Sequence, residues 1–176
     1  MDRFVLISGC SGGGISTLLS ALKRRGHAVV EEPGRRIIAT ELKGSGTALP
    51  WVNLAAFAER AVELSLRDRD DAAGTSGYVF FDRGLIDAAV ALEHATGMPA
   101  LNRYGVLRYN QRVFITPPWP EIYANDDNRQ HSLQEAIAEY ERLLVAFTAL
   151  GYEIEILPKI DVTARADMIL ACLNSA

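Results

Sequence analysis

Short apolar runs alternate with longer segments of helical periodicity along the whole chain. Five runs have the length of a strand: residues 3–8, 27–31, 77–81, 112–116 and 152–157. Glycine or proline stands at several of the boundaries between the two kinds of segment, as at Gly26 and Pro33. Continuous apolar character is typical of parallel strands, because helices cover both faces of a parallel sheet.

Between these runs, apolar residues recur every three to four positions, which predicts helices. The expected helices cover residues 16–25, 33–43, 52–73, 85–96, 101–108, 133–150 and 162–173. The order of elements is therefore β-α-β-α-α-β-α-α-β-α-β-α. It predicts one α/β domain over residues 1–176, with a five-stranded parallel sheet between two layers of helices.

Composition excludes several classes of protein. The net charge of −4 over 176 residues gives no basic footprint for nucleic acid. No run approaches the roughly 20 apolar residues of a membrane span, and the opening MDRFVLISG is too short for a signal peptide. Cys10 and Cys172 have no metal-like spacing. We expect a cytoplasmic protein, and its oligomeric state is left open.

The first apolar run is followed by a glycine-rich segment, residues 9–17, with the sequence GCSGGGIST. Its spacing is that of the Walker A phosphate loop, G-x-x-x-x-G-K-[ST], except for the lysine. Glycines let such a turn direct backbone N–H groups toward one point, and the following helix adds the positive end of its dipole. The residues expected to bind nucleotide are Gly9, Ser11, Gly12, Gly13, Gly14, Ile15, Ser16 and Thr17. A glycine-rich turn without a ligand is the alternative.

Ile15 stands at the lysine position and removes a charge that phosphate chemistry uses. The missing ammonium would contact the β- and γ-phosphates, where charge stabilisation provides much of the catalysis. We expect the rest of the loop to bind a triphosphate, and turnover to be slow unless another cation takes over. Lys23 lies about two helical turns beyond Ser16, so Arg83 and Arg129 are the better candidates.

The second apolar run ends in Glu31-Glu32-Pro33. Ligands of parallel sheets bind beyond the carboxyl ends of the strands, so Glu32 is expected beside the phosphate loop. There it could act as the general base for a substrate hydroxyl. The alternative is a solvated charge at the start of a helix, where an acidic residue also favours the helix dipole.

The third apolar run ends in Phe81-Asp82-Arg83-Gly84. An acidic residue after such a strand occupies the Walker B position, where it holds Mg²⁺ directly or through water. We therefore expect Asp82 and Ser16 to bind the metal, and Arg83 to contact a phosphate with its planar guanidinium. A surface Asp-Arg pair at the start of a helix is the alternative.

Residues 117–131 form a polar, proline-containing segment before a predicted helix. In phosphotransferases, segments of this kind act as lids that exclude water, and Arg129 is expected over the phosphates. A second interpretation is that Arg129 only precedes a capping box, Ser132-x-x-Glu135, which begins the next helix.

Six segments together resemble a bacterial family of predicted P-loop ATPases of nucleoside-kinase type, AAA-type proteins similar to nicotinamide-riboside kinase domains. They are GCSGGGIST, VVEEPGRRII, LPW, VFFDRG, RYNQRVFITPPWPEIYANDDNR and LGYEIEILP, and they run across essentially the whole chain. The resemblance implies a three-layer P-loop NTPase fold with a kinase-like lid, and lysine at position 15. Glu32-Pro33 and Asp82-Arg83 are also similar to motifs of deoxynucleoside kinases, which implies a base and a phosphate clamp.

The leading hypothesis is a phosphotransferase that binds ATP and Mg²⁺ and acts on a small nucleoside- or nucleotide-like acceptor. In it Glu32 activates the acceptor hydroxyl, Asp82 holds the metal, and Arg83 and Arg129 neutralise developing charge. A non-catalytic nucleotide-binding protein is the main alternative, and Ile15 motivates it directly. A simple NTP hydrolase, or a chance variant of a lysine-bearing sequence, are the others.

Overall fold

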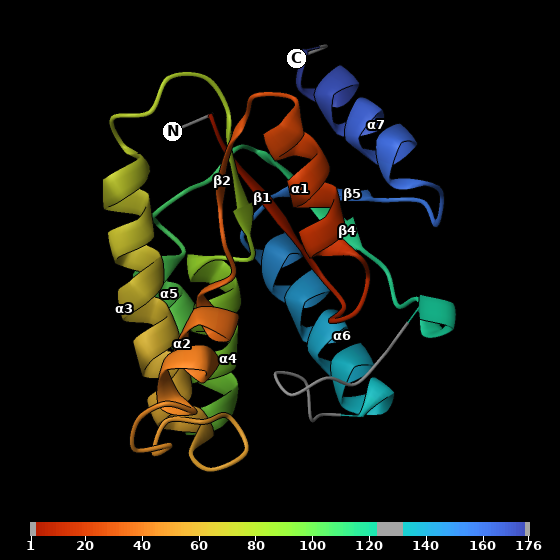
Figure 1. Cartoon of the computed structure of the whole chain (residues 1–176). Helices are drawn as coiled ribbons and strands as arrows, with labels where there is room; N and C mark the ends of the chain where they lie inside the picture. The colour runs from red at the N-terminus through yellow and green to blue at the C-terminus, as the bar shows by residue number, and fades with distance from the viewer. Residues whose placement is uncertain (1–2, 123–131, 175–176) are drawn as a thin grey trace.

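A wholly parallel five-stranded sheet forms the centre of the structure, a computed structural model that describes residues 3–122 and 132–174 (Figure 1). The strands are β1 (Phe4–Gly9), β2 (Ala28–Val30), β3 (Val79–Asp82), β4 (Arg112–Thr116) and β5 (Glu153–Ile156). They lie in the order β2-β3-β1-β4-β5, so β1 is central and β3 and β4 flank it. The predicted α/β fold class is confirmed.

The helices also occur where the apolar periodicity predicts them. They are α1 (Ile15–Arg24), α2 (Pro33–Glu41), α3 (Leu54–Ala72), α4 (Leu85–Thr96), α5 (Ala100–Tyr104), α6 (Leu133–Ala149) and α7 (Val162–Asn174). The sequence prediction extends α5 to residue 108, but the helix ends at Tyr104, and Asn110 already donates a hydrogen bond to the carbonyl of Phe4 at the sheet. A short 3₁₀ helix, η1 (Pro120–Ile122), was not predicted.

Alternate side chains of the central strand enter two separate apolar clusters. Phe4 and Leu6 of β1 pack in a cluster that contains residues of α3, α4 and α6. Val5 and Ile7 pack in the other, which contains residues of α1 and α7. Successive side chains of a strand point to opposite faces, so these clusters lie on the two sides of the sheet and make the fold three-layered (Figure 1).

Two helix caps are present. The Ser132 hydroxyl accepts a hydrogen bond from the Glu135 amide, and the Glu135 carboxylate accepts one from the Ser132 amide. Asp161 accepts hydrogen bonds from the first amides of α7. Cys10 and Cys172 are not joined by a disulfide. Within residues 3–122 and 132–174, no helix has the length and apolar character needed to cross a membrane.

The glycine-rich loop after β1 lies directly against the end of β4. The amide of Cys10 donates a 2.9 Å hydrogen bond to the carbonyl of Thr116. Gly9 has a φ of +123°, and a Cβ atom placed on it would lie 2.3 Å from that same carbonyl oxygen. A Cβ atom on Gly13 would lie 2.6 Å from the Thr116 hydroxyl. Both glycines are therefore required by close packing, in addition to any contact with a ligand.

Gly9→Ala is expected to lower the free energy of unfolding by about 3 kcal/mol or more, since it adds a backbone clash to an unfavourable φ. Urea denaturation followed by circular dichroism measures the change. Gly26→Ala is the matched control, because Gly26 also has a positive φ (+88°) but has open space around it. It should cost only about 1 kcal/mol. Equal losses in the two variants would contradict this account of the loop.

Candidate functional site

The phosphate loop, residues 9–17, leads into α1 through Gly14, whose φ of 82° places it in the left-handed region. Gly14 is the N-cap residue and has no side chain to accept a hydrogen bond from the first amides of the helix. The first four N–H groups of a helix have no acceptor within it, and the helix dipole makes this end positive. Ser16 and Thr17, in the first turn, are exposed. The arrangement suits an anion.

Ile15 contributes no charge to this site. Its side chain is 7% exposed and belongs to the apolar cluster that joins α1, α7 and the sheet. Ile15, at the lysine position of the motif, therefore stabilises the packing of α1 and does not face a ligand as a charged group.

Asp82 ends β3, beside the central strand, and lies next to the start of α1. Its carboxylate is 3.4 Å from the Ser16 hydroxyl, which donates to it. Burial and, to a smaller extent, the nearby Glu32 carboxylate raise the pKa of Asp82 to about 7, although Arg83 and Arg35 act in the opposite sense. The sequence therefore identifies correctly which acidic residue lies beside the loop.

The pair of Ser16 and Asp82 fits a magnesium ion bound together with a nucleotide. Mg²⁺ commonly uses one or two carboxylates and takes its remaining ligands from water and substrate phosphates. A buried carboxylate with a raised pKa, paired only weakly with a hydroxyl, gains most from a nearby cation. In the part of the chain that is described, no group of three or more His, Cys, Asp or Glu side chains could hold a metal alone.

Arg83 lies between the carboxylates of the site. Among the described residues other than glycine, it alone has a positive φ, of 57°. Its guanidinium donates a 2.6 Å hydrogen bond to Glu139 of α6 and a 2.9 Å hydrogen bond to the carbonyl of Gly9, and lies 3.8 Å from Glu32. Burial alone would lower the pKa of Arg83, but Glu139 and Glu32 raise it above its ordinary value. In this structure Arg83 ties α6 and Glu32 to the loop.

Glu32 begins α2 and is half-buried, with its carboxylate 2.9 Å from the Nε atom of Arg35. It lines a cavity of about 280 Å³ together with Ser16 and Asp82. The other residues that line this cavity are Leu19, Ser20, Lys23, Val29, Glu31, Arg35 and Arg36. The sequence-predicted residues Glu32, Ser16 and Asp82 thus meet in one polar cavity beside the first turn of α1.

Two residues that the sequence analysis missed, Asp87 and Tyr109, hold the Asp82-Arg83-Gly84 turn in place through hydrogen bonds. Asp87 of α4 accepts hydrogen bonds from the Ser8 hydroxyl and, at 3.0 Å, from the Gly84 amide. Burial raises the pKa of Asp87 to about 6, against the opposing effect of Arg83. The buried Tyr109 hydroxyl accepts a 3.0 Å hydrogen bond from the Leu85 amide. Tyr109 belongs to the segment RYN, so that sequence block buttresses the turn.

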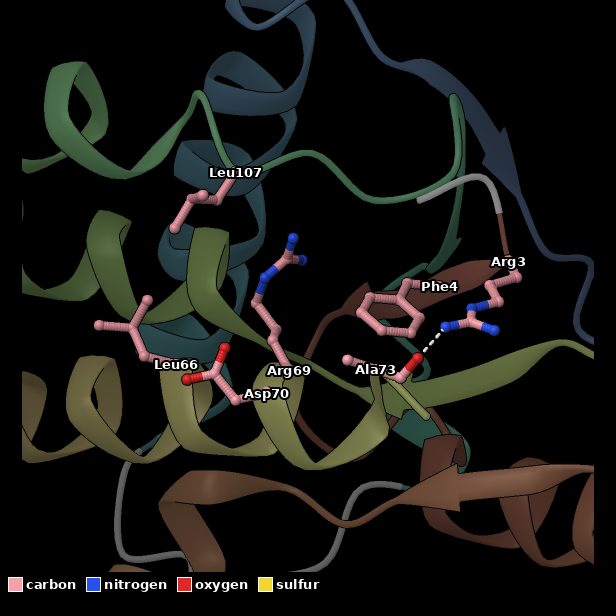
Figure 2. Close-up of a pocket in the computed structure, with 7 residues that line it drawn as sticks. All are labelled: Arg3, Phe4, Leu66, Arg69, Asp70, Ala73 and Leu107. Atoms are coloured by element: carbon pink, nitrogen blue, oxygen red, sulfur yellow. Dashed lines mark hydrogen bonds between the residues drawn. The ribbon is translucent and has the colours of Figure 1, made fainter. Parts of the chain in front are cut away.

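A larger cavity, of about 470 Å³, lies away from the phosphate loop, where β1 begins (Figure 2). Arg3, Phe4 and the α3 residues Leu66, Arg69 and Asp70 line it. Its cations have partners in the fold: Arg3 donates to the carbonyls of Ala73 and Thr75, and the Arg69 guanidinium lies 4.4 Å from the centre of the Tyr109 ring. No sequence-predicted site residue lines this cavity.

Arg129 and most of the predicted lid, residues 123–131, lie outside the described residues. Trp119 and Ile122, from the described part of that segment, lie close to the loop: Ile122 approaches Gly14, and Trp119 faces Arg165 of α7. Arg165 is a further residue that the sequence analysis missed. It donates a 3.2 Å hydrogen bond to the carbonyl of Gly13.

Comparison with known proteins agrees with this fold. The profile of the family described as AAA domain matches residues 4–165 of this chain. No curated protein matches it in sequence. A deoxyadenosine kinase from M. mycoides, solved with dCMP and dCDP, is similar in structure, with a TM-score of 0.64 and 12% identity over 98% of each chain.

Two further solved structures have the same fold. Shikimate kinase from Acinetobacter baumannii, in complex with shikimate, gives a TM-score of 0.61 and 14% identity over 98% of this chain and 93% of that chain. NadR, in complex with NAD and AMP-PNP, gives a TM-score of 0.67 and 17% identity over 98% of this chain, which spans 49% of the length of NadR. At these identities the likeness shows the fold: a kinase-like P-loop nucleotide-binding fold.

Ionisation of Asp82 is expected to destabilise the fold as the pH rises. Its pKa of about 7 exceeds that of an unfolded aspartate, about 4, so the native state retains a proton that the unfolded chain has lost between these values. The stabilisation from this proton is fully present below about pH 4 and is lost as the pH rises through about 7. Asp87 acts in the same direction.

Asp82→Asn should therefore remove a decline in unfolding free energy on the order of 2 kcal/mol between about pH 5 and about pH 8. Urea denaturation at the two pH values measures it. Asp161→Asn is the control, because Asp161 caps α7 at the surface and asparagine caps equally well. Parallel pH profiles for Asp82→Asn and the natural protein would show that Asp82 is not a strained buried carboxyl.

Proposed function

We propose that this chain, which belongs to the AAA domain family, is an ATP-binding phosphotransferase that acts on a small, polar, nucleoside- or nucleotide-like acceptor. One observation carries the proposal. Ser16, Asp82 and Glu32 line the same cavity, directly beside the uncapped start of α1. A candidate metal-binding pair and a candidate base therefore line one cavity beside the proposed anion site, as transfer of a phosphoryl group to a hydroxyl requires.

The triphosphate is proposed to lie on the amides of the phosphate loop and the first turn of α1. Ser16 and Asp82 would hold Mg²⁺, which supplies charge neutralisation at the phosphate oxygens when it is bound. Glu32 accepts the proton of the acceptor hydroxyl. Arg83 orients Glu32 and fixes the loop through the carbonyl of Gly9, and its bond to Glu139 leaves it a positioning residue in this structure.

The size and charge of the cavity support a small polar acceptor. At about 280 Å³ it is close to the lower end of ligand sites, which commonly measure roughly 300–1,000 Å³. Its lining includes Glu31, Glu32 and Asp82 as well as Lys23, Arg35 and Arg36. Such a lining favours a ligand with several hydroxyl or phosphate groups over an apolar one.

A second candidate function is nucleotide binding without transfer. The observation that favours it is Ile15, an apolar side chain packed into the core where the motif calls for an ammonium. The anion site and the cavity are compatible with both functions. The two candidate functions differ only in whether the γ-phosphoryl group is stabilised during transfer.

Ile15→Lys separates the two functions. We expect it to raise acceptor-dependent ADP release by about 100-fold if no other cation contacts the γ-phosphoryl group, and by much less if another cation already stabilises that group during transfer. The assay is coupled ADP detection with ATP, Mg²⁺ and a panel of nucleosides and nucleoside monophosphates. Ile15→Met is the matched control: it changes the shape of the side chain without adding charge, and should leave the rate unchanged.

Each outcome has a distinct meaning. Transfer by the natural protein supports the enzyme, and transfer by Ile15→Lys alone supports the binding protein. ADP release that no acceptor increases identifies a hydrolase. If neither protein transfers phosphate to any acceptor, the proposal of a phosphotransferase is wrong. Glu32→Gln in the Ile15→Lys protein should reduce transfer about 100-fold or more, while nucleotide binding persists.

A further inference from the structure

Arg165 places a guanidinium against the phosphate loop from α7, the helix that packs beside α1. It lies in the first turn of α7, and its amide bonds to the carbonyl of Asp161, the residue that caps the helix. Its Nη1 atom donates a 3.2 Å hydrogen bond to the carbonyl of Gly13 and lies 3.2 Å from where a Cβ atom on Gly14 would be. The residue is 3% exposed.

The remaining edge of this guanidinium is unused. Neither Nε nor Nη2 of Arg165 has a hydrogen-bond partner within the described residues, and both atoms are buried. Burial lowers the pKa of Arg165, as expected for a cation taken out of water without an anion to replace it. Leaving buried charged donors unpaired is costly, so the edge needs an acceptor.

The chemistry of that edge defines the acceptor. The Nε–H and Nη2–H groups of an arginine point the same way in one plane and match two oxygens of a phosphate or carboxylate. The third nitrogen of the same guanidinium, Nη1, contacts Gly13 and the position of a Cβ atom on Gly14, immediately before the uncapped start of α1. A phosphate held by that helix start is therefore the nearest anion this fold could offer.

Arg83 and the two arginines that line the cavity, Arg35 and Arg36, are already paired. Arg83 bonds to Glu139, Arg35 to Glu32 and Arg36 to Asp68. Arg165 has no such anion in the described part of the chain, where its side chain donates a hydrogen bond to a loop carbonyl. Moreover, Ile15 packs in the same apolar cluster as Ala166, the residue after Arg165. The apolar side chain at position 15 thus helps to hold α7, and with it Arg165, against the loop.

We propose that Arg165 supplies the positive charge that lysine would supply at position 15, by binding a phosphate oxygen of the nucleotide held on the phosphate loop. The inference rests on the proposed nucleotide binding. It explains how a chain with isoleucine at position 15 could still present a positive charge to the nucleotide. In the structure the Trp119 ring centre lies 5.8 Å from the guanidinium carbon, and Ile122 approaches Gly14. A phosphate reaches the unused edge when these two side chains move aside.

Arg165→Gln tests the proposal. Glutamine keeps an N–H donor for the carbonyl of Gly13 but removes the charge and the second donor edge. Isothermal titration with Mg²⁺-ATP should show binding about 10- to 100-fold weaker than for the natural protein, the usual effect of losing a charge-assisted hydrogen bond. Binding of adenosine, which has no phosphate, should change less than about twofold. ADP, AMP and inorganic phosphate, titrated in parallel, identify the phosphate that Arg165 contacts.

Arg25→Gln is the matched control. Arg25 also links α1 to α7, through a 2.7 Å ion pair with Asp167 and a hydrogen bond to the carbonyl of Thr163, but at the other end of α1 from the phosphate loop. Like Arg165→Gln, this variant replaces one arginine by glutamine and so removes one positive charge. Its affinity for Mg²⁺-ATP should stay within about twofold of the natural value.

A second measurement tests directly whether Arg165 and a lysine at position 15 can replace one another as the source of positive charge. Ile15→Lys should strengthen ATP binding more in the Arg165→Gln protein than in the natural protein, because the two cations then substitute for one another. Equal effects in both backgrounds would overturn the proposal, as would equal losses of ATP and adenosine binding in Arg165→Gln, which would make Arg165 a structural support only. If Arg165→Gln does not fold, Arg165→Lys keeps the charge and should lose affinity for ATP but not for adenosine.

If the natural protein binds no nucleotide at all, the proposed function fails rather than the assignment of Arg165. Normal ATP affinity in a folded Arg165→Gln protein has the opposite meaning, since nucleotide binding then stands and the role of Arg165 does not.

Discussion

The close approach of the phosphate loop to Thr116 is the contact on which the rest of the site depends. The loop can lie against the end of β4 only because Gly9 and Gly13 have no side chains there, and the Cys10 amide fixes the distance through its bond to the Thr116 carbonyl. The Thr116 hydroxyl in turn donates to the carbonyl of Ser8. This packing sets the direction in which α1 begins, and so where its positive end points.

The charges of the site are arranged around that fixed loop. Arg83 holds Glu32 and Glu139 on one side, while Asp82 lies buried beside them and accepts a hydrogen bond from the Ser16 hydroxyl. On the other side of the loop, Arg165 is buried, and its Nε and Nη2 atoms have no partner among the described residues. Within that part of the chain, Asp82 forms no ion pair and Arg165 contacts no anion, and the helix start lies between them. A nucleotide phosphate with its metal ion would satisfy both.

Much of this could be predicted from the sequence. Continuous apolar runs predict the five strands, because a sheet covered on both faces has no polar side. The glycine spacing predicts the loop, and the alternation of elements places Glu32, Asp82 and Ser16 at one edge of the sheet. These inferences succeed because each depends on local sequence and on the shared geometry of parallel strands.

The pairings across the sheet could not be predicted in the same way. Arg83 is expected to clamp a phosphate, but it bonds to Glu139, which lies 56 positions later in the chain. Arg165 and Gly13 are 152 positions apart, and no local pattern marks their contact. Tyr109 buttresses the turn after β3 for similar reasons of tertiary packing. Such contacts depend on how helices lie across the sheet, and spacing along the chain does not encode that.

The most direct test of the central claim is an amide-resolved NMR titration of the natural protein with Mg²⁺-ATP and, separately, with adenosine. The account predicts that the triphosphate shifts the backbone amide signals of residues 10–16 most strongly, and that adenosine leaves these signals nearly unchanged. Triphosphate-induced shifts centred instead on the cavity near Arg3 and Arg69, or no shifts at millimolar concentration, would contradict it.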